Sequence, residues 1–386
     1  MNLRLSRLNR RINLDIEGNN AFFLWGPRKT GKTTFLKQQF GNAVFFDLLD
    51  PICQTQFTLH PEELQHFVLG NHPDMVVLDE IQKIPAMLDT IHWCLENTKT
   101  KFILCGSSAR KLKRGAANLL GGRAWRYEMF PLTSSEIIDF DLHRALNHGL
   151  IPQHYLSDKP DKFLTGYILE YIHEEIQAEA SLQKMRSFEA FLRVIATHHG
   201  QLINYANIAR ECGVSAPTIR GYFEILEDTL LGYTLPPWTK STHYRLIETG
   251  KFYLFDTGLA RKLRGIDQLL PQTSEFGHAF EHFIINEIRA FLSYSETDKK
   301  LSFWRTSNGY EVDIIVGNMA LSIEVKAKSG VKPHDVQGLQ ALLNEKHKPN
   351  LALVISMDTT KKAFTNGITV LPWQEFCNEL WAGKLL

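Results

Sequence analysis

Residues 21–34 read AFFLWGPRKTGKTT, and this stretch decides the fold of the amino-terminal part of the chain. An apolar run of strand length is followed by GPRKTGKT, which fits the spacing G-x-x-x-x-G-K-S/T and opens a helical stretch. Gly26 and Gly31 permit backbone torsions and a close approach that a Cβ would block. The N–H groups of the loop and of the first helical turn then point toward phosphate oxygens. We therefore predict a strand, a phosphate-binding loop and a helix.

The side chains of this motif suit a nucleoside triphosphate bound with its metal ion. Lys32 supplies a positive charge for the β- and γ-phosphates, and the Thr33 hydroxyl takes a place on Mg²⁺. The alternative, a glycine-rich turn that occurs by chance, is disfavoured by this context and by a second motif further along. The predicted ATP-binding residues are Gly26, Pro27, Arg28, Lys29, Thr30, Gly31, Lys32, Thr33 and Thr34.

The second motif is DMVVLDEIQ at residues 74–82, an apolar run that ends in two adjacent carboxylates. We expect Asp79 to bind Mg²⁺ through water and Glu80 to orient the attacking water. A strand at 44–48 lies in sequence between the two motifs, which favours the ATPases that insert a strand between these elements. The next apolar run, KFILCGSS, brings Ser107 and Ser108 to the same edge of the sheet. Either hydroxyl senses the γ-phosphate or only caps a helix, and both interpretations stay open.

A basic stretch follows. From Lys99 to Tyr127 the chain carries eight basic residues and no acid. Such a run is commonly a solvated face, and its place after the sensor strand also suits a transition-state arginine or a nucleic-acid patch. Gly121-Gly122 lets Arg123 sit on a sharp turn, so Arg123 is our candidate for a γ-phosphate arginine.

Composition bounds the class of protein. The 386 residues suggest roughly two to three domains. A net charge of +1 excludes a globally basic nucleic-acid coat or an acidic tail protein, so a charged partner needs a local patch. Five cysteines without a C-x-x-C pair argue for a reducing compartment, and we expect a cytoplasmic protein. No apolar run approaches the ~18 residues that span a bilayer, so we expect no membrane insertion.

The middle of the chain predicts a helix-turn-helix at residues 188–237. Phe191 and Ile195 mark the inward face of one helix, and Ser215 is placed to cap another at 216–228. A Gly-Tyr-Thr-Leu strand follows, so the segment resembles a winged helix. Its recognition helix carries few positively charged residues. It could therefore mediate protein contacts or a lid motion instead of reading DNA, and these alternatives stay open.

The carboxy-terminal stretch NGYEVDIIVGNMALSIEVKAK, residues 308–328, contains the spacing D-x10-E-x-K at Asp313, Glu324 and Lys326. We predict two strands around a tight turn at Gly317-Asn318. With a two-residue loop Asp313 faces Ser322 and Glu324 is its diagonal neighbour, whereas a four-residue loop places Asp313 directly opposite Glu324. Both registers put the two acids and the lysine on one face, with apolar side chains on the other.

Two carboxylates in this arrangement can share a Mg²⁺ or Mn²⁺ ion, while Lys326 orients or deprotonates a water for attack on a phosphodiester. Glu281, on a helix predicted over residues 278–292, can complete the metal shell. The alternative is an amphipathic hairpin whose acids are ordinary surface residues paired with Lys326.

Six segments together resemble a known family: GPRKTGKTT, VVLDEIQ, LCGSSARKL, LLGGR with FPLTSSE, KFYLFDTGLA at 251–260, and GYEVDIIV with IEVKAK. The family consists of bacterial and archaeal AAA+-like ATPases joined to a carboxy-terminal domain of unknown function, whose last part resembles the PD-(D/E)xK nuclease fold. The resemblance spans nearly the whole chain. It implies an α/β protein with a P-loop NTPase parallel sheet at 1–150, a helical winged-helix domain at 151–265, and a restriction-endonuclease-like module at 266–386.

The resemblance also implies residue roles. ATP hydrolysis would be carried by Lys32, Thr33, Asp79 and Glu80, and phosphodiester cleavage by Asp313, Glu324 and Lys326 with Glu281.

Two functions compete. In the first, ATP binding sets a conformation or a homo-oligomer, and the carboxy-terminal module cuts DNA, including branched or otherwise structured DNA, with Mg²⁺ or Mn²⁺. In the second, the protein is a signalling or scaffold ATPase whose nuclease-like fold only docks protein or nucleic acid. The near-neutral charge favours the second slightly, because a DNA channel needs a clear basic stripe.

Overall fold

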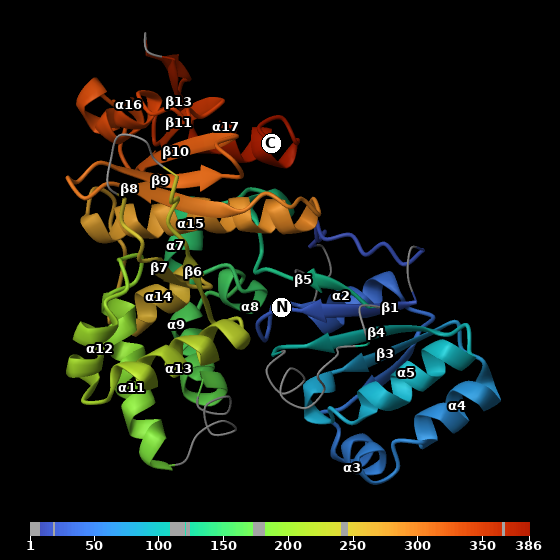
Figure 1. Cartoon of the computed structure of the whole chain (residues 1–386). Coiled ribbons are helices and arrows are strands. Elements are labelled where there is room, and N and C mark those ends of the chain that lie inside the picture. Colours follow the sequence, from blue (N-terminus) through green and yellow to red (C-terminus); the bar gives the residue numbers. More distant parts are fainter. Residues whose placement is uncertain are drawn as a thin grey trace. The chain divides into compact units, whose positions relative to one another are not determined.

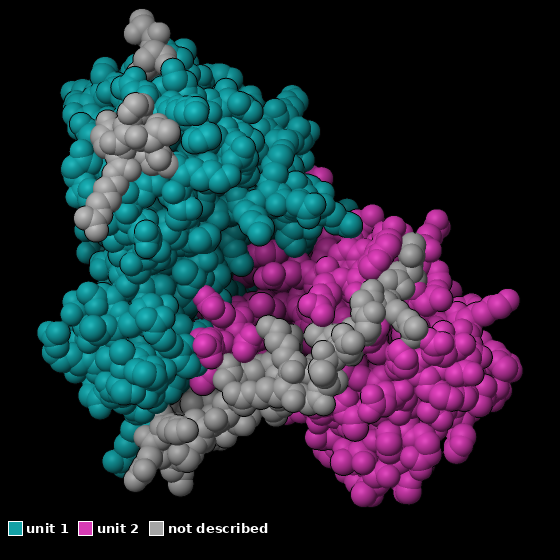
Figure 2. All heavy atoms as spheres, in the orientation of Figure 1, with its two compact units in different colours: residues 1–9, 133–223, 232–386 teal, residues 10–132, 224–231 magenta. Residues whose placement is uncertain are grey.

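The computed structural model describes residues 8–17, 20–108, 120, 124–172, 182–240, 246–364 and 367–386. These residues form two compact units, which Figure 2 shows in different colours. The N-terminal unit comprises residues 10–132 and 224–231, and the C-terminal unit comprises residues 1–9, 133–223 and 232–386. The middle and carboxy-terminal segments thus group in one unit, and the division into three domains at residues 150 and 265 stays a prediction.

A five-stranded parallel sheet forms the centre of the N-terminal unit, in the order β2-β3-β4-β1-β5 (Figure 1). Its strands are β1 (Ala21–Trp25), β2 (Val44–Asp47), β3 (Met75–Asp79), β4 (Lys101–Gly106) and β5 (Ala124–Glu128). Its helices are α2 (Lys32–Gln39), α3 (Pro51–Leu59), α4 (Glu63–Asn71) and α5 (Met87–Asn97). Because β4 lies between β1 and β3, one strand separates the phosphate loop from the acidic strand end. The inserted strand that the sequence favoured is therefore present, but it is β4, whereas the strand at 44–48, β2, lies at the edge of the sheet.

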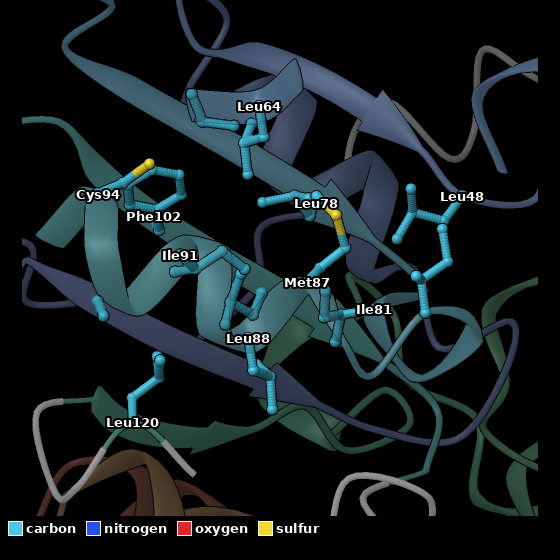
Figure 3. Packing of buried hydrophobic residues seen from close by; sticks show 14 of the residues in the cluster. Leu48, Leu64, Leu78, Ile81, Met87, Leu88, Ile91, Cys94, Phe102 and Leu120 are labelled. Atoms are coloured by element: carbon cyan, nitrogen blue, oxygen red, sulfur yellow. The ribbon is translucent and has the colours of Figure 1, made fainter. Parts of the chain in front are cut away.

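The core of this unit lies between the sheet and its helices. Met87, Ile91 and Cys94 of α5 point toward Leu78 and Phe102 of the sheet (Figure 3). All five side chains are buried, and burying a side chain of this size contributes about 1.5–3 kcal/mol. This packing fixes the strand ends that carry the predicted site.

Strand β5 was not anticipated. It pairs in parallel with β1 at the edge of the sheet, and its residues Trp125 and Arg126 are exposed. An edge strand with one solvated side lacks the continuous apolar run that identifies a buried parallel strand. The basic stretch from Lys99 to Arg126 therefore includes sheet as well as loop, while residues 109–119 and 121–123 lie outside the described part of the chain.

The C-terminal unit begins with helices and a two-stranded antiparallel sheet, β6-β7. Its helical elements before the large sheet are α7 (Leu142–His148), α8 (Pro152–Tyr155), α9 (Pro160–Gly166), a π-helix (Tyr167–Ile172), α11 (Leu182–Thr197), α12 (Tyr205–Cys212) and α14 (Thr257–Leu263). Helix α13 (Ala216–Asp228) belongs to this unit up to residue 223, and its last residues belong to the N-terminal unit. The strands are β6 (Gly232–Leu235) and β7 (Lys251–Leu254). Phe191 and Ile195 are buried on α11, and the Ser215 side chain accepts a hydrogen bond from the Thr218 N–H, so the predicted helix face and cap are confirmed.

A six-stranded mixed sheet, in the order β12-β13-β11-β10-β9-β8, forms the rest of this unit. Its strands are β8 (Leu301–Arg305), β9 (Glu311–Val316), β10 (Leu321–Lys326), β11 (Leu351–Ser356), β12 (Lys362–Ala363) and β13 (Ile368–Pro372). Its helices are α15 (Ser274–Tyr294), α16 (Gln337–Leu343) and α17 (Trp373–Trp381). Helix α15 runs along the sheet and contacts β10 (Figure 1). Among the helices that the structure describes, none has the length and apolar character needed to cross a bilayer.

The register of the β9–β10 hairpin decides how its acids meet. Leu321 pairs with Val316 and Ile323 with Ile314, so residues 317–320 form a four-residue loop. The two-residue turn at Gly317-Asn318 is therefore wrong, and the four-residue alternative is correct. Within this loop Met319 takes a positive φ of 62° and buries its side chain in the core of the sheet.

Candidate functional site

The phosphate loop closes around the Lys32 side chain. Its ammonium donates hydrogen bonds to the carbonyls of Gly26 at 2.7 Å and Pro27 at 3.0 Å. Gly31 has a φ of +96°, which favours glycine, and a Cβ on Gly26 would lie 2.4 Å from the Met129 carbonyl oxygen. Both glycines are thus required by the backbone itself.

The remaining loop residues differ in exposure. Thr30 is buried, and its hydroxyl donates to the Pro27 carbonyl at 2.8 Å. Arg28 is half-buried, whereas Lys29 and Thr34 are exposed to solvent.

Thr33 and Asp79 come together from α2 and β3. The Thr33 hydroxyl donates to Asp79 Oδ2 at 2.5 Å, although the two residues are far apart in sequence. Oxygen atoms of this kind are the ligands that Mg²⁺ prefers. The structure therefore brings together the two side chains that were predicted to act on the metal.

Glu80 follows directly and adopts a left-handed backbone conformation, with φ 58° and ψ 45°. Its carboxylate accepts a hydrogen bond from the Gln82 side-chain amide, which also donates to the Ser107 hydroxyl at 3.0 Å. Positive φ at a residue with a long side chain is uncommon and turns Glu80 away from the strand direction. The Ser108 hydroxyl donates instead to the Asp228 carbonyl at 3.3 Å, so Ser107 is the serine that lies beside Glu80.

Two residues near this site had no role in the sequence interpretation. Gln82 joins Glu80 to Ser107, and the only signal for it was its place in the quoted segment LDEIQ. Arg10 donates to the Thr30 carbonyl at 2.8 Å and to the Phe130 carbonyl at 2.5 Å, which ties the segment before β1 to the loop. Arg123, the candidate γ-phosphate arginine, lies outside the described residues.

A second cluster of charged side chains lines a cavity of about 630 Å³ in the C-terminal unit. All four residues predicted for phosphodiester cleavage line it: Glu281, Asp313, Glu324 and Lys326. Glu281 comes from α15, and the other three come from the β9–β10 hairpin. The sequence spacing and the helical glutamate therefore converge on one cavity.

Asp313 and Glu324 lie level in the hairpin, one position beyond the last paired residues. Asp313 Oδ2 accepts a hydrogen bond from the Val325 N–H at 2.8 Å, and Glu324 Oε1 accepts one from Lys326 Nζ at 2.6 Å. The other oxygen of Glu324, Oε2, is buried and has no hydrogen-bond partner. A buried carboxylate oxygen without a donor is costly, and a cation can offset that cost.

Burial acts strongly on both acids. It raises the pKa of Asp313 to about 7, and the Glu281 carboxylate adds to the effect. Burial and the neighbouring Asp313 raise the pKa of Glu324 well above its ordinary range. Burial lowers the pKa of the Lys326 ammonium, but the nearby Glu324 and Asp313 carboxylates raise it by more, so that its pKa lies above the ordinary value. The lysine is thus protonated at neutral pH.

Glu281 is held from behind by strand β7. Its Oε1 accepts a hydrogen bond from the Tyr253 hydroxyl at 2.6 Å and lies 3.6 Å from Lys251 Nζ. Burial and then Glu281 raise the pKa of Tyr253 well above its usual value, so the hydroxyl stays protonated. Lys251 also pairs with Glu311 at 2.6 Å.

This arrangement limits the predicted metal shell. Within the parts of the chain that the structure describes, no group of three or more His, Cys, Asp or Glu side chains is arranged to hold a metal ion. The Glu281 carboxylate contacts Tyr253 and Lys251. Of the three predicted acids, Asp313 and Glu324 are the two that lie opposite each other in the hairpin. Sequence reasoning missed Lys251, Tyr253 and Glu311, although the first two lie in the quoted segment KFYLFDTGLA.

Comparisons with known proteins divide the chain into three matched segments. Residues 18–138 match the family model described as "AAA domain". The N-terminal unit is an AAA-like ATPase domain. Residues 139–270 and 276–376 each match a model described only as a domain of unknown function, DUF8612 and DUF4143.

Relatives with similar sequences are themselves uncharacterized. One from Mycobacterium bovis and one from Mycobacterium tuberculosis are each 26% identical over 341 residues, which cover 86% of this chain and 75% of the relative. Among solved structures, a Walker-type ATPase of Pyrococcus abyssi is 15% identical and gives a TM-score of 0.46 over 64% of this chain and 92% of its own.

The AAA-like domain accounts for the first of the two sites. The matched segment contains the loop residues from Gly26 to Thr34, the Asp79–Glu80 pair and Ser107. The cavity of the C-terminal unit is lined mainly by residues of the DUF4143 match, and residues 200–202 and Lys251 come from the DUF8612 match before it.

Proposed function

We propose that this chain hydrolyses ATP in its AAA-like domain and cleaves DNA, including branched or structured DNA, in its C-terminal unit with the help of a divalent cation. The observation that carries the second half is the pair of level carboxylates, half-buried Asp313 and buried Glu324, beside a protonated Lys326 in a cavity. This pattern of two acids and a lysine on one face supports a restriction-endonuclease-like module of the PD-(D/E)xK type.

In the ATPase half, the chain's own groups bind the triphosphate and prepare water. Lys32 already lies inside the loop and would transfer its hydrogen bonds from the Gly26 and Pro27 carbonyls to phosphate oxygens. Thr33 and Asp79 would hold Mg²⁺, which offsets the phosphate charge. Glu80 would orient the attacking water, with Gln82 and Ser107 fixing its carboxylate. Arg123 is proposed to reach the γ-phosphate.

The carboxylate centre suits a divalent cation. Glu324 Oε2 has no hydrogen-bond partner, and burial raises the pKa values of Asp313 and Glu324. The two acids are therefore desolvated, and the positive charge around them does not compensate for that loss of water. Mg²⁺ is commonly bound by one or two carboxylates, with water and substrate phosphate completing its shell. A bound cation would polarise a phosphoryl oxygen and acidify a bound water. Asp313 and Glu324 would hold it, and Mn²⁺ accepts the same ligands.

The other residues of the cavity have separate tasks. Lys326 keeps its proton, so it would orient the attacking water and stabilise the charge that develops on the phosphate rather than remove a proton. Glu281 would contact the cation directly or hold a water on it. Arg305, which pairs with Glu311 at 3.2 Å on the cavity wall, would contact the DNA backbone.

The middle of the chain supports a winged-helix interpretation. Helices α11, α12 and α13 are followed by the antiparallel pair β6-β7, which is the order that a winged helix requires. Arg220 on α13 stacks over the Tyr205 ring, 4.2 Å from its centre, and both side chains reach the surface. We propose that this segment is a separate domain at 151–265 that contacts DNA, and that the protein acts in the cytoplasm as a monomer or a homo-oligomer.

The ATPase half is tested by nucleotide binding. Lys32→Ala removes the charge for the β- and γ-phosphates, and we expect it to abolish measurable ATP binding by calorimetry while the far-UV circular dichroism stays that of the wild type. Unchanged ATP affinity in a folded Lys32→Ala variant would contradict the assignment.

The nuclease half is tested with purified protein, Mg²⁺ or Mn²⁺, and three DNA substrates: linear duplex, single strand and four-way junction. We expect at least one substrate to be cut, and Lys326→Ala to cut far more slowly at equal metal occupancy. If no substrate is cut, or if Lys326→Ala cuts as well as the wild type, the cleavage proposal is wrong.

The alternative is a signalling or scaffold ATPase that uses this unit for docking. It is favoured by the Lys326–Glu324 ion pair, which can be a purely structural contact. Metal binding separates the two functions. Only the cleavage proposal expects calorimetry to detect Mn²⁺ binding that disappears in Asp313→Ala.

A further inference from the structure

Strand β7 belongs to the middle of the chain and contributes Lys251 to the lining of the cavity. Its sequence, KFYL, belongs to the segment KFYLFDTGLA, to which no step of the proposed chemistry assigns a role. All four of its residues are buried, and alternate side chains of the strand reach the cavity side. Lys251 and Tyr253 are those alternate residues, and both contact Glu281.

We propose that Tyr253 is a positioning residue of the metal centre: its hydroxyl fixes the Glu281 carboxylate, so that β7 is a working part of the C-terminal site. The proposal rests on the metal-dependent cleavage proposed above and adds a residue to it. Tyr253 is 1% exposed and does not itself line the cavity, so it would act through Glu281, which does.

The geometry supports orientation rather than packing alone. A phenol that donates to a carboxylate at 2.6 Å makes a short, charge-assisted hydrogen bond, which fixes the direction of the acceptor. Lys251 lies 3.6 Å from the same oxygen, Oε1. Because Oε1 contacts both Tyr253 and Lys251, the other carboxylate oxygen of Glu281 would be the one to act in the cavity, where Asp313 and Glu324 lie.

Such outer contacts matter for metal sites. Groups that hydrogen-bond to a metal-binding carboxylate, or to the carboxylate that holds a metal-bound water, set its orientation, and removing one weakens metal binding by about 10- to 100-fold. Glu281 projects from helix α15 into an open cavity. Without a hydrogen-bond partner, rotation about its side-chain bonds would let its carboxylate take several orientations. Tyr253 removes that freedom.

The chain offers a matched control in Tyr233. Its ring stacks on that of Tyr253 with centroids 5.6 Å apart, and its hydroxyl also donates to a side-chain oxygen, Asn286 Oδ1, at 3.0 Å. Asn286 is not part of the cavity lining. Tyr233→Phe thus removes a comparable hydroxyl from the same stack without touching the carboxylate centre.

The experiment measures Mn²⁺ binding to the full chain by calorimetry for the wild type, Tyr253→Phe and Tyr233→Phe. Both variants keep their rings, so we expect similar thermal midpoints for the two. We expect the Mn²⁺ dissociation constant to rise by about tenfold or more in Tyr253→Phe. In Tyr233→Phe it should stay within about twofold, the scatter of independent sites.

Glu281→Gln completes the design. If Tyr253 acts through Glu281, adding Tyr253→Phe to Glu281→Gln should not weaken Mn²⁺ binding further, because the two substitutions remove one and the same effect. Equal Mn²⁺ affinities of Tyr253→Phe and Tyr233→Phe, or additive effects of Tyr253→Phe and Glu281→Gln, would overturn the positioning role and leave the cleavage proposal standing. A wild type that binds no Mn²⁺ would overturn both.

Discussion

Glu287 provides a sharp test of the energetics of the C-terminal unit, because it is a buried carboxylate held by three donors. It accepts hydrogen bonds from the Ser134 N–H at 2.8 Å, the Ser134 hydroxyl at 2.7 Å and the Trp381 indole N–H at 2.7 Å. It therefore joins α15 to α17 and to the segment at residues 133–136. The perturbation that we develop is Glu287→Gln, followed across pH.

The expected magnitude follows from burial. Glu287 is 2% exposed, and burial raises its pKa to about 7 from the ordinary 4.5, although the Trp381 and Ser134 donors oppose the rise. The folded carboxyl thus binds its proton more tightly than the unfolded one. Its stabilising contribution is fully present below pH 4.5 and is lost as the pH rises through 7. The difference corresponds to at most about 3 kcal/mol.

The assay is thermal unfolding of the wild type, Glu287→Gln and a surface control, Glu248→Gln, between pH 5 and pH 8. We expect the wild-type midpoint for the C-terminal unit to fall with rising pH, with Glu287 responsible for up to about 6–12 °C of the fall. Glu287→Gln should show a flatter profile, because its amide does not titrate. It should also start lower at pH 5, since its side-chain N–H faces one of the three donors at a cost of about 1–3 kcal/mol.

The control separates this effect from general charge. Glu248 is exposed, so its variant should follow the wild-type profile in parallel. If Glu287→Gln and the wild type lose the same number of degrees between pH 5 and pH 8, the carboxyl does not change its protonation on folding, and the reasoning from burial is refuted.

Three further predictions concern single side chains. Gly26→Ala should weaken ATP binding by about tenfold or more in a fluorescent-nucleotide titration, because its Cβ would meet the Met129 carbonyl and displace the loop. The control Gly41→Ala, whose Cβ would make only ordinary contacts, should bind ATP like the wild type. Glu80→Gln should retain ATP affinity but slow phosphate release by about 10²- to 10⁴-fold, and an unchanged rate would remove Glu80 from the hydrolytic step. Asp256→Ala should destabilise the C-terminal unit by about 2–5 kcal/mol in urea unfolding, because it leaves two buried N–H groups without their acceptor, and a loss below about 1 kcal/mol would show that water replaces it.

Much of the nucleotide site was predictable because its chemistry is local in sequence. The segment at 26–34 specifies a loop through two glycines and a helix start, and the loop around Lys32 has the expected form. The run that ends at Asp79 and Glu80 is a buried strand, as predicted, and the Thr33 hydroxyl contacts Asp79, the other residue that was predicted to act on the metal. The role of Gln82 was not predictable, since it depends on the backbone turn at Glu80.

The carboxylate centre was predictable only in part. Alternation along the strands placed Asp313, Glu324 and Lys326 on one face, but it left two registers open. The pairing of Leu321 with Val316 decides between them, and that pairing is a property of the assembled sheet. Strand β5 escaped prediction for a related reason, since an exposed edge strand carries a weak apolar signal.

The sequence by itself determined the groups that are close along the chain: the phosphate loop, the acid pair after β3, and the acids and lysine of the hairpin. Short-range geometry fixes these, because turns, helix starts and strand alternation depend on neighbouring residues. Only the tertiary structure brought Tyr253 to Glu281 and Ser134 to Glu287, across 28 and 153 positions. Such contacts depend on how whole elements pack, and packing is set by the shape and burial of many side chains together.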